Sequence, residues 1–269
     1  MGIKEPQEVA LAGVEKGAQK AALPWYDGLV AGVLAGAYIA FGGLLAVAVS
    51  SGLDEETWGT LPTLFAGAVF SMGLILVMIA GSELLTGNMA LVPIALFDGR
   101  TTVRDLLRSF GVVLVGNLAG ALLVAYFLAV QTGVVTAELP FERLEGIALE
   151  KGVELTNWEI FLRGVGANWL VCLAVWLGLA AEDAAGKILG IFFPILGFVA
   201  MGFDHVIANM FFLPAAIWAG VDVGWVDTLR NWLFSGVGNL VGAVVFVAGA
   251  KWYLFVRHRE DDEPSDVAA

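Results

Sequence analysis

The sequence predicts an all-α integral membrane protein of six transmembrane spans, arranged as a 3+3 inverted repeat with broken second and fifth spans. Three observations support this prediction: an apolar composition, six stretches of membrane-spanning length, and a polar motif that occurs twice. Apolar residues make up 59% of the 269-residue chain and charged residues only 15%. A soluble core cannot bury so large an apolar fraction, so we expect one membrane domain.

Six apolar stretches are long enough to cross a hydrocarbon core of about 30 Å, which needs roughly 20 helical residues each. The second and fifth stretches are too long for one upright helix, and both contain polar residues. We interpret each as two half-helices joined near the middle of the membrane. The six stretches are residues 28–51, 63–97, 106–130, 158–181, 188–219 and 231–256.

An internal repeat places the two interruptions in register. Residues 81–93 read GSELLTGNMALVP, and residues 202–214, which lie 121 positions later, read GFDHVIANMFFLP. A second pair of motifs, GNL at 116–118 and at 238–240, supports the same relation. Polar breaks at matching positions of two hydrophobic halves predict a transport site at the repeat interface. The matched pairs are Gly81 with Gly202, Glu83 with Asp204, Asn88 with Asn209, Met89 with Met210 and Pro93 with Pro214.

The distribution of basic residues predicts the orientation of the spans, because lysine and arginine near span ends favour the cytoplasmic side. Ten of the 14 basic residues lie on one side if both termini are cytoplasmic. Three spans in each half is an odd number, so the second half is expected to be inverted relative to the first. The ten are Lys4, Lys16, Lys20, Arg100, Arg104, Arg108, Lys187, Lys251, Arg257 and Arg259.

The chain is expected to have three parts. Residues 1–25 mix charged and apolar positions, which predicts a cytoplasmic amphipathic helix rather than a signal peptide. Residues 26–257 form the six-span transport domain, and residues 258–269 an acidic cytoplasmic tail. The net charge of −12 argues against a nucleic-acid partner. Cys172 is the only cysteine, which excludes an intrachain disulfide and a cysteine-based metal cluster.

Around the breaks the chain resembles the formate/nitrite transporter family. The resemblance covers nearly the whole chain, and four pieces occur in order. Any one of them is a modest signal, and together they are a strong one. They are residues 70–88 (FSMGLILVMIAGSELLTGN), 167–178 (ANWLVCLAVWLG), 202–214, and the two GNL motifs.

This resemblance implies a fold, a substrate class and a set of site residues. It implies an aquaporin-like fold in a homopentamer of the cell membrane that passes small monovalent anions of weak acids, together with protons. His205 matches the pore histidine of the family, and Asp204 is its acidic neighbour. The other matches to pore residues are Thr86, Asn168, Asn239 and, after a one-residue shift relative to Asn168, Lys151.

Four apolar side chains match family positions that form constrictions on either side of the histidine. A dry constriction penalises a bare charge. The resemblance therefore favours substrates that share or accept a proton, and it disfavours strong-acid anions and metal cations. The four residues are Phe70, Leu74, Leu84 and Phe198.

The residues themselves support an anion site. A broken helix frees backbone N–H and C=O groups, so each break must face protein or a water-filled cavity. Helices that begin near Asn88 and Asn209 would direct partial positive charge inward. His205 is the only ionisable base expected near the midplane, and we hypothesise that it handles the proton of the substrate.

Structural interpretations stay open for several of these residues. A histidine in a membrane span also serves as a hydrogen-bonding plug for a broken helix. Glu83 and Asp204 are explained more readily as anchors of the loops than as pore-lining acids. Asn117 and Asn239 fit helix packing beside small neighbours, although the resemblance favours a pore role for Asn239.

Two departures from the family pattern leave the substrate open. Asp204 stands where glutamate is more usual, and Leu85 stands where formate channels commonly have phenylalanine. Formate, nitrite and hydrosulfide are therefore alternatives, with hydrosulfide the closest competitor.

Three rival functions lie outside this class. A neutral-solute channel of the aquaporin type is disfavoured, because methionine follows both Asn88 and Asn209 in place of the asparagine-proline-alanine signature. An enzyme would need a metal set, a nucleophile with a base, or paired haem ligands, and His205 with His258 supplies none of these. We therefore expect no cofactor. A sensor without transport stays open until flux is measured.

Overall fold

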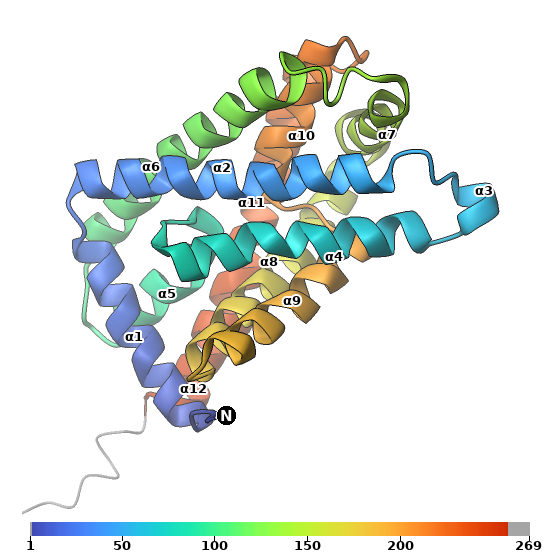
Figure 1. Ribbon diagram of the computed structural model, residues 1–269. Coiled ribbons are helices and arrows are strands. Elements are labelled where there is room, and N and C mark those ends of the chain that lie inside the picture. Colours follow the sequence, from blue (N-terminus) through green and yellow to red (C-terminus); the bar gives the residue numbers. More distant parts are fainter. Residues whose placement is uncertain (1, 258–269) are drawn as a thin grey trace, which may run out of the picture.

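The structure, a computed structural model, describes residues 2–257. Helices form nearly all of this part of the chain, and one isolated β-bridge pairs Ile3 with Ala181 (Figure 1). The acidic tail predicted at 258–269, which includes His258, lies outside the described residues.

The first half of the chain consists of helices joined by short loops, and two of the helices continue into π-helical turns. The elements are α1 (Pro6–Ala22), α2 (Trp25–Ser50), α3 (Glu55–Trp58), α4 (Leu61–Leu76) with η1 (Val77–Gly81), α5 (Leu85–Phe97), and α6 (Val103–Leu123) with η2 (Val124–Val130).

The second half contains the corresponding series. Its elements are α7 (Glu138–Leu149) with η3 (Glu150–Glu154), α8 (Asn157–Ala180), α9 (Ala184–Ala200), α10 (Val206–Ala219), and α11 (Trp225–Ala243) with η4 (Val244–Gly249) and α12 (Ala250–Phe255).

Five helical segments of the described chain are long and apolar enough to cross a membrane. They correspond to the first, second, third, fourth and sixth predicted spans, and the fifth is divided between α9 and α10. The second span differs from the half-helix prediction: Leu61–Gly81 has 21 residues, which is a spanning length in itself, and α5 follows with 13. The two breaks are present, but their parts are unequal in length. The five segments are Trp25–Ser50, Leu61–Gly81, Val103–Val130, Asn157–Ala180 and Trp225–Phe255.

Matching helix contacts in the two halves show that the structural repeat is larger than the sequence repeat. Helix α2 packs against α4 and α6, and α8 packs against α9 and α11 in the same way. Helix α1 packs on α5, just as α7 packs on α10. The N-terminal helix is therefore the counterpart of α7, and each repeat contains one helix in addition to its spans. Helices α4 and α9 contact each other where the two repeats meet.

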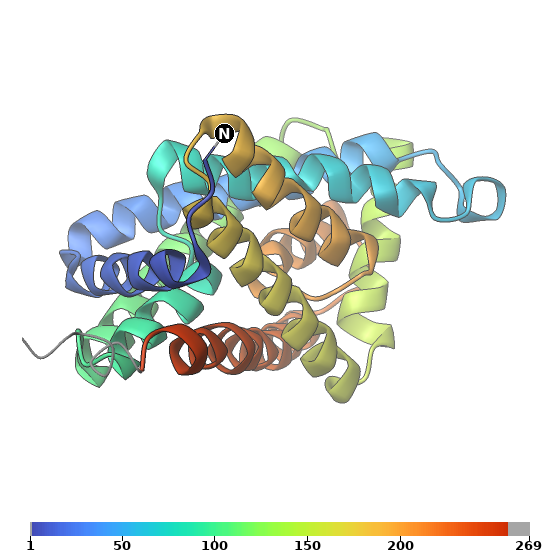
Figure 2. The same cartoon turned by 90° about the horizontal axis from the view of Figure 1, so that it is seen from below.

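The two repeats are inverted, as predicted. Helix α2 begins after α1 and ends at Ser50, whose Oγ accepts a hydrogen bond of 3.1 Å from Arg143 Nε on α7. Helix α8 begins after α7 and ends at Ala180, whose carbonyl accepts from the Lys4 N–H, 3.0 Å away, just before α1. The equivalent helices α2 and α8 therefore run in opposite directions. Figure 2 shows the N-terminal residues beside the start of α9, where the bridge to Ala181 forms.

Small residues allow the helices within each repeat to approach closely. A Cβ atom added to Gly36 on α2 would lie 2.0 Å from the Asn117 carbonyl oxygen on α6. A Cβ added to Gly238 on α11 would lie 2.2 Å from the Phe161 carbonyl oxygen on α8. Glycine is required at both crossings, because any larger side chain would push the helices apart.

Candidate functional site

Both breaks start in the same way. Gly81 and Gly202 have left-handed backbone conformations, with φ of +81° and +69°. Glycine adopts this conformation without a Cβ clash, which explains why both copies carry it. A short extended segment follows, and the next helix starts after an N-cap residue, Leu84 before α5 and His205 before α10.

An asparagine from the third span clamps the first break. Asn117 Nδ2 donates to the carbonyl oxygens of Gly32 (2.9 Å) and Glu83 (2.8 Å), and its Oδ1 accepts from the Leu85 N–H (2.9 Å). The side chain is fully buried and supplies partners to the Glu83 carbonyl and the Leu85 N–H, two backbone groups that the break has freed.

Asn239 clamps the second break with the matching set of contacts. Its Nδ2 donates to the carbonyl oxygens of Gly164 and Asp204, and its Oδ1 accepts from the Val206 N–H, all at 2.8 Å. The side-chain amide is therefore directed at backbone, and Asn239 lines neither of the two cavities described below. The structure places Asn239 next to the site as a support of the loop, the role that Asn117 has in the other half.

A lysine, a carboxylate and an asparagine meet at the first break. Lys20 Nζ, from α1, lies 2.7 Å from Glu83 Oε1, and Asn88 Nδ2 donates to Glu83 Oε2 over 2.9 Å. Both oxygens of Glu83 are thus engaged. Burial lowers the pKa of Lys20 below its ordinary value, and the nearby Glu83 carboxylate opposes that shift.

The same trio occurs at the second break, with one difference. Asp204 Oδ1 accepts from Lys151 Nζ at 3.0 Å and from Asn209 Nδ2 at 2.8 Å, and Asn231 Nδ2 lies 3.5 Å away. Asp204 Oδ2 is buried and has no donor within the described residues. Aspartate is one methylene shorter than glutamate, so only one of its oxygens reaches the donors. Both carboxylates bind side chains of other helices, which favours the anchoring interpretation.

A hydrogen bond between side chains joins the two breaks. His205 Nε2 lies 2.8 Å from Thr86 Oγ1, in the first turn of α5. Both side chains are buried, His205 at 2% exposure and Thr86 at 0%. The structure therefore brings together two of the residues predicted for the pore, one from each half of the chain.

The backbone determines which nitrogen of His205 carries the hydrogen. Nδ1 accepts a hydrogen bond of 3.2 Å from the Ala208 N–H, as an N-cap of α10. A backbone N–H can only donate, so Nδ1 is unprotonated and the neutral ring carries its hydrogen on Nε2. Nε2 then donates to Thr86 Oγ1, which leaves the Thr86 hydroxyl hydrogen to donate elsewhere. Protonation of Nδ1 would break the cap and place a cation at a helix N-terminus.

Asn168 connects the first break to the last span. Its Nδ2 donates to the carbonyl oxygens of Asn239 (2.8 Å) and Thr86 (3.2 Å). The Cys172 thiol, one turn later, donates to the same Thr86 carbonyl at 3.3 Å. These contacts fix the backbone of Thr86 and hence the position of its hydroxyl. Within the described residues, no group of three or more histidine, cysteine or carboxylate side chains could hold a metal ion.

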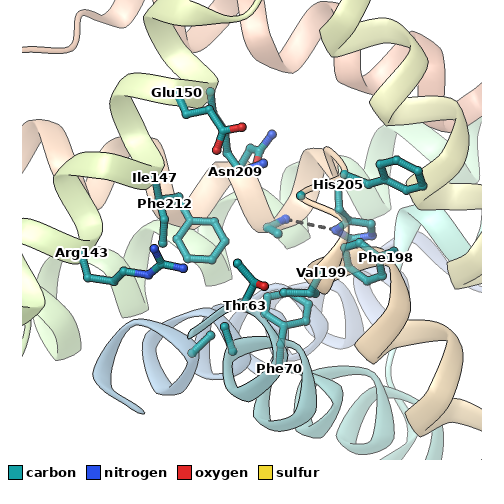
Figure 3. Close-up of a pocket in the computed structure, with 16 residues that line it drawn as sticks. Thr63, Phe70, Arg143, Ile147, Glu150, Phe198, Val199, His205, Asn209 and Phe212 are labelled. Carbon is teal, nitrogen blue, oxygen red and sulfur yellow. Dashed lines mark hydrogen bonds between the residues drawn. The ribbon is translucent and has the colours of Figure 1, made fainter. Parts of the chain in front are cut away.

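A cavity of about 100 Å³ lies on the α7 side of His205. Figure 3 shows His205 and Phe198 at one end of this cavity and Arg143 with Ile147 at the other. Lys151 and Asn209, from the second trio, also line it. Of the polar residues predicted for the pore, His205 and Lys151 line this cavity, which we call the outer cavity, and the other four, Thr86, Asn168, Asn239 and Asp204, do not.

A smaller cavity of about 20 Å³ lies next to the first break. Lys20, Leu74, Leu84 and Asn88 are among its lining residues. Leu84, Asn88 and Lys20 occupy positions equivalent to those of His205, Asn209 and Lys151 in the outer cavity. This inner cavity is therefore the repeat-related counterpart of the outer one.

The four predicted constriction residues divide between the two cavities. Phe70 packs edge-on against Phe198, with ring centroids 5.8 Å apart, and stacks on Phe212 at 6.5 Å. The Phe198 ring lies 5.9 Å from that of His205. Leu74 and Leu84 are 1% and 2% exposed and line the inner cavity. The phenylalanines therefore lie next to His205 in the outer cavity, and the leucines belong to the inner cavity.

Lys151 lies in a π-helical turn just before the fourth span. The turn η3 covers Glu150–Glu154 and therefore includes Lys151. A π turn accommodates one residue more than an α-helical turn. From this turn the ammonium group of Lys151 reaches Asp204, and the match of Lys151 to the lysine of the family stays a prediction.

Sequence reasoning missed two side chains that contact the carboxylates. Lys20 precedes Glu83 by 63 residues, whereas Lys151 precedes Asp204 by 53, so a fixed repeat offset does not pair the two lysines. The available signal was that each lysine lies near the end of an amphipathic segment just before a span. Asn231 at the start of the last span gave no comparable signal.

Comparison with known proteins identifies the family. The formate/nitrite transporter family matches residues 7–253. The chain belongs to this family. Three similar relatives are an uncharacterised transporter of Bacillus subtilis (45% identity over 97% of this chain and 96% of the relative), a probable formate transporter of Methanothermobacter thermautotrophicus (44%; 94% and 98%) and a formate channel of Bacillus thuringiensis (37%; 93% and 95%).

Solved structures agree with this assignment. A channel described as an FNT family ion channel superimposes with a TM-score of 0.85 at 28% identity, over 91% of this chain and 98% of that one. A pentameric formate channel with formate bound gives 0.76 at 28%, over 87% and 98%. This member of the formate/nitrite transporter family is therefore a multi-pass membrane protein, and its relatives are transporters and channels rather than enzymes.

Proposed function

We propose that this transporter carries small monovalent weak-acid anions, formate and/or nitrite, through a pore centred on His205. The observation that carries the proposal is the 2.8 Å contact between His205 Nε2 and Thr86 Oγ1, which joins the two helix breaks between the outer and inner cavities. We place the protein in the cell membrane with both termini in the cytoplasm, as the distribution of lysine and arginine predicts.

The chemistry of the pore follows from its donors and its apolar walls. Lys151 and Lys20, one in each cavity, supply positive charge at the approaches. His205 Nε2–H and the Thr86 hydroxyl supply donors that replace part of the water shell of an anion. Phe70 and Phe198 on one side, with the leucines on the other, disfavour a bare charge. A weak acid passes because it can accept a proton before it crosses the apolar section.

Formate is the first substrate to test. Two similar relatives are named as formate transporters or channels, and one solved relative contains formate. Nitrite has similar size and charge. Hydrosulfide is the alternative substrate, because it is also a small weak-acid anion.

We also propose a homopentamer. The solved formate channel that resembles this chain is pentameric. Exposed apolar side chains on several spans are available to lipid or to neighbouring subunits. Cross-linking and mass measurement in mild detergent would give five subunits if the proposal holds.

The decisive experiment measures flux with purified protein in proteoliposomes. Vesicles loaded with formate, nitrite or hydrosulfide and an internal pH dye are diluted into substrate-free buffer at pH 7 and at pH 5, with protein-free liposomes as the control. We expect protein-dependent efflux that raises the internal pH, because each anion leaves with a proton. If none of the three anions shows protein-dependent efflux, the proposal fails and the neutral-solute and sensor functions return.

A further inference from the structure

We propose that the amide oxygens of Asn209 and Asn88 accept the acidic hydrogen of the neutral form of the substrate, one in each cavity. This inference rests on the proposed function, because it specifies the protonation state in which the substrate occupies the two cavities. It assigns a specificity role to two residues that sequence analysis noted only as parts of the breaks.

The contacts of Asn209 leave its oxygen available. Its Nδ2 donates to Asp204 Oδ1 and to Asn231 Oδ1, each at 2.8 Å, so both amide hydrogens are used. This fixes the orientation of the amide, because both partners are acceptors. Asn209 Oδ1 is buried and has no donor within the described residues. A buried carbonyl oxygen in this state favours any ligand that brings a hydrogen.

Asn88 repeats the arrangement at the matching position. Its Nδ2 donates to Glu83 Oε2 at 2.9 Å, and its buried Oδ1 has no donor in the described part of the chain. The coincidence at equivalent positions of both halves argues against a local accident of packing. A feature that the inverted repeat keeps in both halves is symmetric about the pore centre, as two binding stations would be.

Both asparagines line cavities, and the nearby cations are already engaged. Asn209 lines the outer cavity and Asn88 the inner one. Lys151 and Lys20 in these cavities are bound to Asp204 and Glu83. A free amide oxygen repels an anion and attracts an O–H group. The protonated acid is therefore the form that fits next to the asparagines.

The two cavities differ in the size of the group that they can hold. A water molecule needs roughly 10–15 Å³ of such space. The outer cavity, at about 100 Å³, has room for a small acid, whereas the inner cavity, at about 20 Å³, holds one water-sized group and has to widen before a whole acid molecule enters. Water is the rival donor for both oxygens, and the experiment must separate it from the acid.

The choice of substrate makes that separation. Formic acid has a strong O–H donor, whereas hydrogen sulfide has only a weak S–H donor. If the amide oxygen binds the acid directly, its removal should lower formate flux much more than hydrosulfide flux. If the amide oxygen only holds a water molecule, its removal should lower the flux of both substrates by the same factor.

The test compares Asn209→Ala with Asn231→Ala in proteoliposomes. Asn231 belongs to the same network, but its Oδ1 already accepts from Asn209 and it does not line the outer cavity. We expect Asn209→Ala to lower the ratio of formate flux to hydrosulfide flux about tenfold, and Asn231→Ala to lower both fluxes in parallel. An unchanged ratio in Asn209→Ala, or the same change in both variants, overturns the inference. Absence of flux in the unsubstituted protein instead overturns the proposed function.

A measurement on the unsubstituted protein keeps the inference testable if a variant does not fold. Infrared difference spectra with ¹³C-formate distinguish the carbonyl band of the protonated acid from the carboxylate bands. At pH 7, where free formate is ionised, we expect a bound population with the protonated band. Bound formate that shows carboxylate bands alone would contradict the inference.

Discussion

The two helix breaks share one scaffold and differ in the residues that face the centre. Both start at a glycine with positive φ, both are clamped by an asparagine of a GNL motif, and both bind a lysine through a carboxylate. The N-cap residue, however, is Leu84 in the first break and His205 in the second. The duplicated contacts of the glycines, the GNL asparagines and the carboxylates therefore support the loops, and the contact that joins the two breaks depends on positions where the copies differ.

Each half supplies one polar group to the centre. The first break provides Thr86, and the position equivalent to it in the second break is Ile207. The second provides His205, and the position equivalent to it in the first is Leu84. The centre therefore contains one polar pair, His205 with Thr86, rather than two symmetric pairs. The asymmetry leaves one polar contact between the two breaks and apolar side chains near it, an arrangement that the proposed barrier to bare ions requires.

The largest effect on transport is expected when the N-cap residue of the second break is replaced by that of the first. His205→Leu removes the Nε2 contact to Thr86 and the cap on Ala208. We expect formate flux in proteoliposomes to fall roughly tenfold to a hundredfold, because a hydrogen-bond donor to the charged substrate is lost. Size-exclusion chromatography controls for folding. A well-folded variant with an unchanged rate and pH profile would falsify the role of His205.

Removal of either GNL asparagine, Asn117 or Asn239, is expected to lower the stability of the fold by the same amount. Asn117→Ala and Asn239→Ala each remove three hydrogen bonds to buried backbone groups, two of them at the break itself, which should lower the free energy of unfolding by about 2–4 kcal/mol. Thermal unfolding in detergent measures both variants under one set of conditions. If Asn239→Ala is nearly neutral for stability while Asn117→Ala is not, the two breaks are not equivalent in their support.

Exchanging the two carboxylate residues should change the free energy of unfolding by smaller amounts, with opposite signs at the two breaks. Asp204→Glu adds the methylene that allows a second oxygen to reach a donor, and Glu83→Asp removes it. We expect about 1 kcal/mol of stabilisation for the first change and a loss of similar size for the second. Destabilisation by both would mean that the second break is fitted to the shorter side chain.

The smallest effect concerns the lysine of the first break. The pKa of Lys20 is lowered by burial, so between that value and its ordinary 10.5 the unfolded chain binds more protons than the folded chain. The contribution of Lys20 to stability therefore rises with pH across this alkaline window. Lys20→Met should flatten the rise in the unfolding midpoint between pH 8 and pH 11. Parallel curves for the two proteins would contradict the assignment.

Much of this architecture could be predicted because it depends on patterns within short stretches of the sequence. The span lengths, the two breaks and the inversion follow from hydropathy, from the repeat and from the placement of basic residues. The roles of Asn117 and Asn239 could not be separated by sequence, because only the contacts of their side chains show that both bind backbone. The pairing of Lys20 with Glu83 was missed for the same reason, since these residues lie far apart in the chain. The tautomer of His205 depends on the Ala208 N–H, which no pattern of residue types reveals.

The most direct test of the central claim is the protonation state of His205. The chain contains two histidines, so ¹⁵N-histidine labelling of a His258→Gln variant leaves one imidazole to observe by solid-state NMR. We predict a neutral ring at pH 7 with the hydrogen on Nε2 and Nδ1 as an acceptor, and a shift of the Nε2 signal when formate is added. A doubly protonated ring, or a ring that does not respond to formate, would contradict the claim that His205 acts as a neutral donor to the anion.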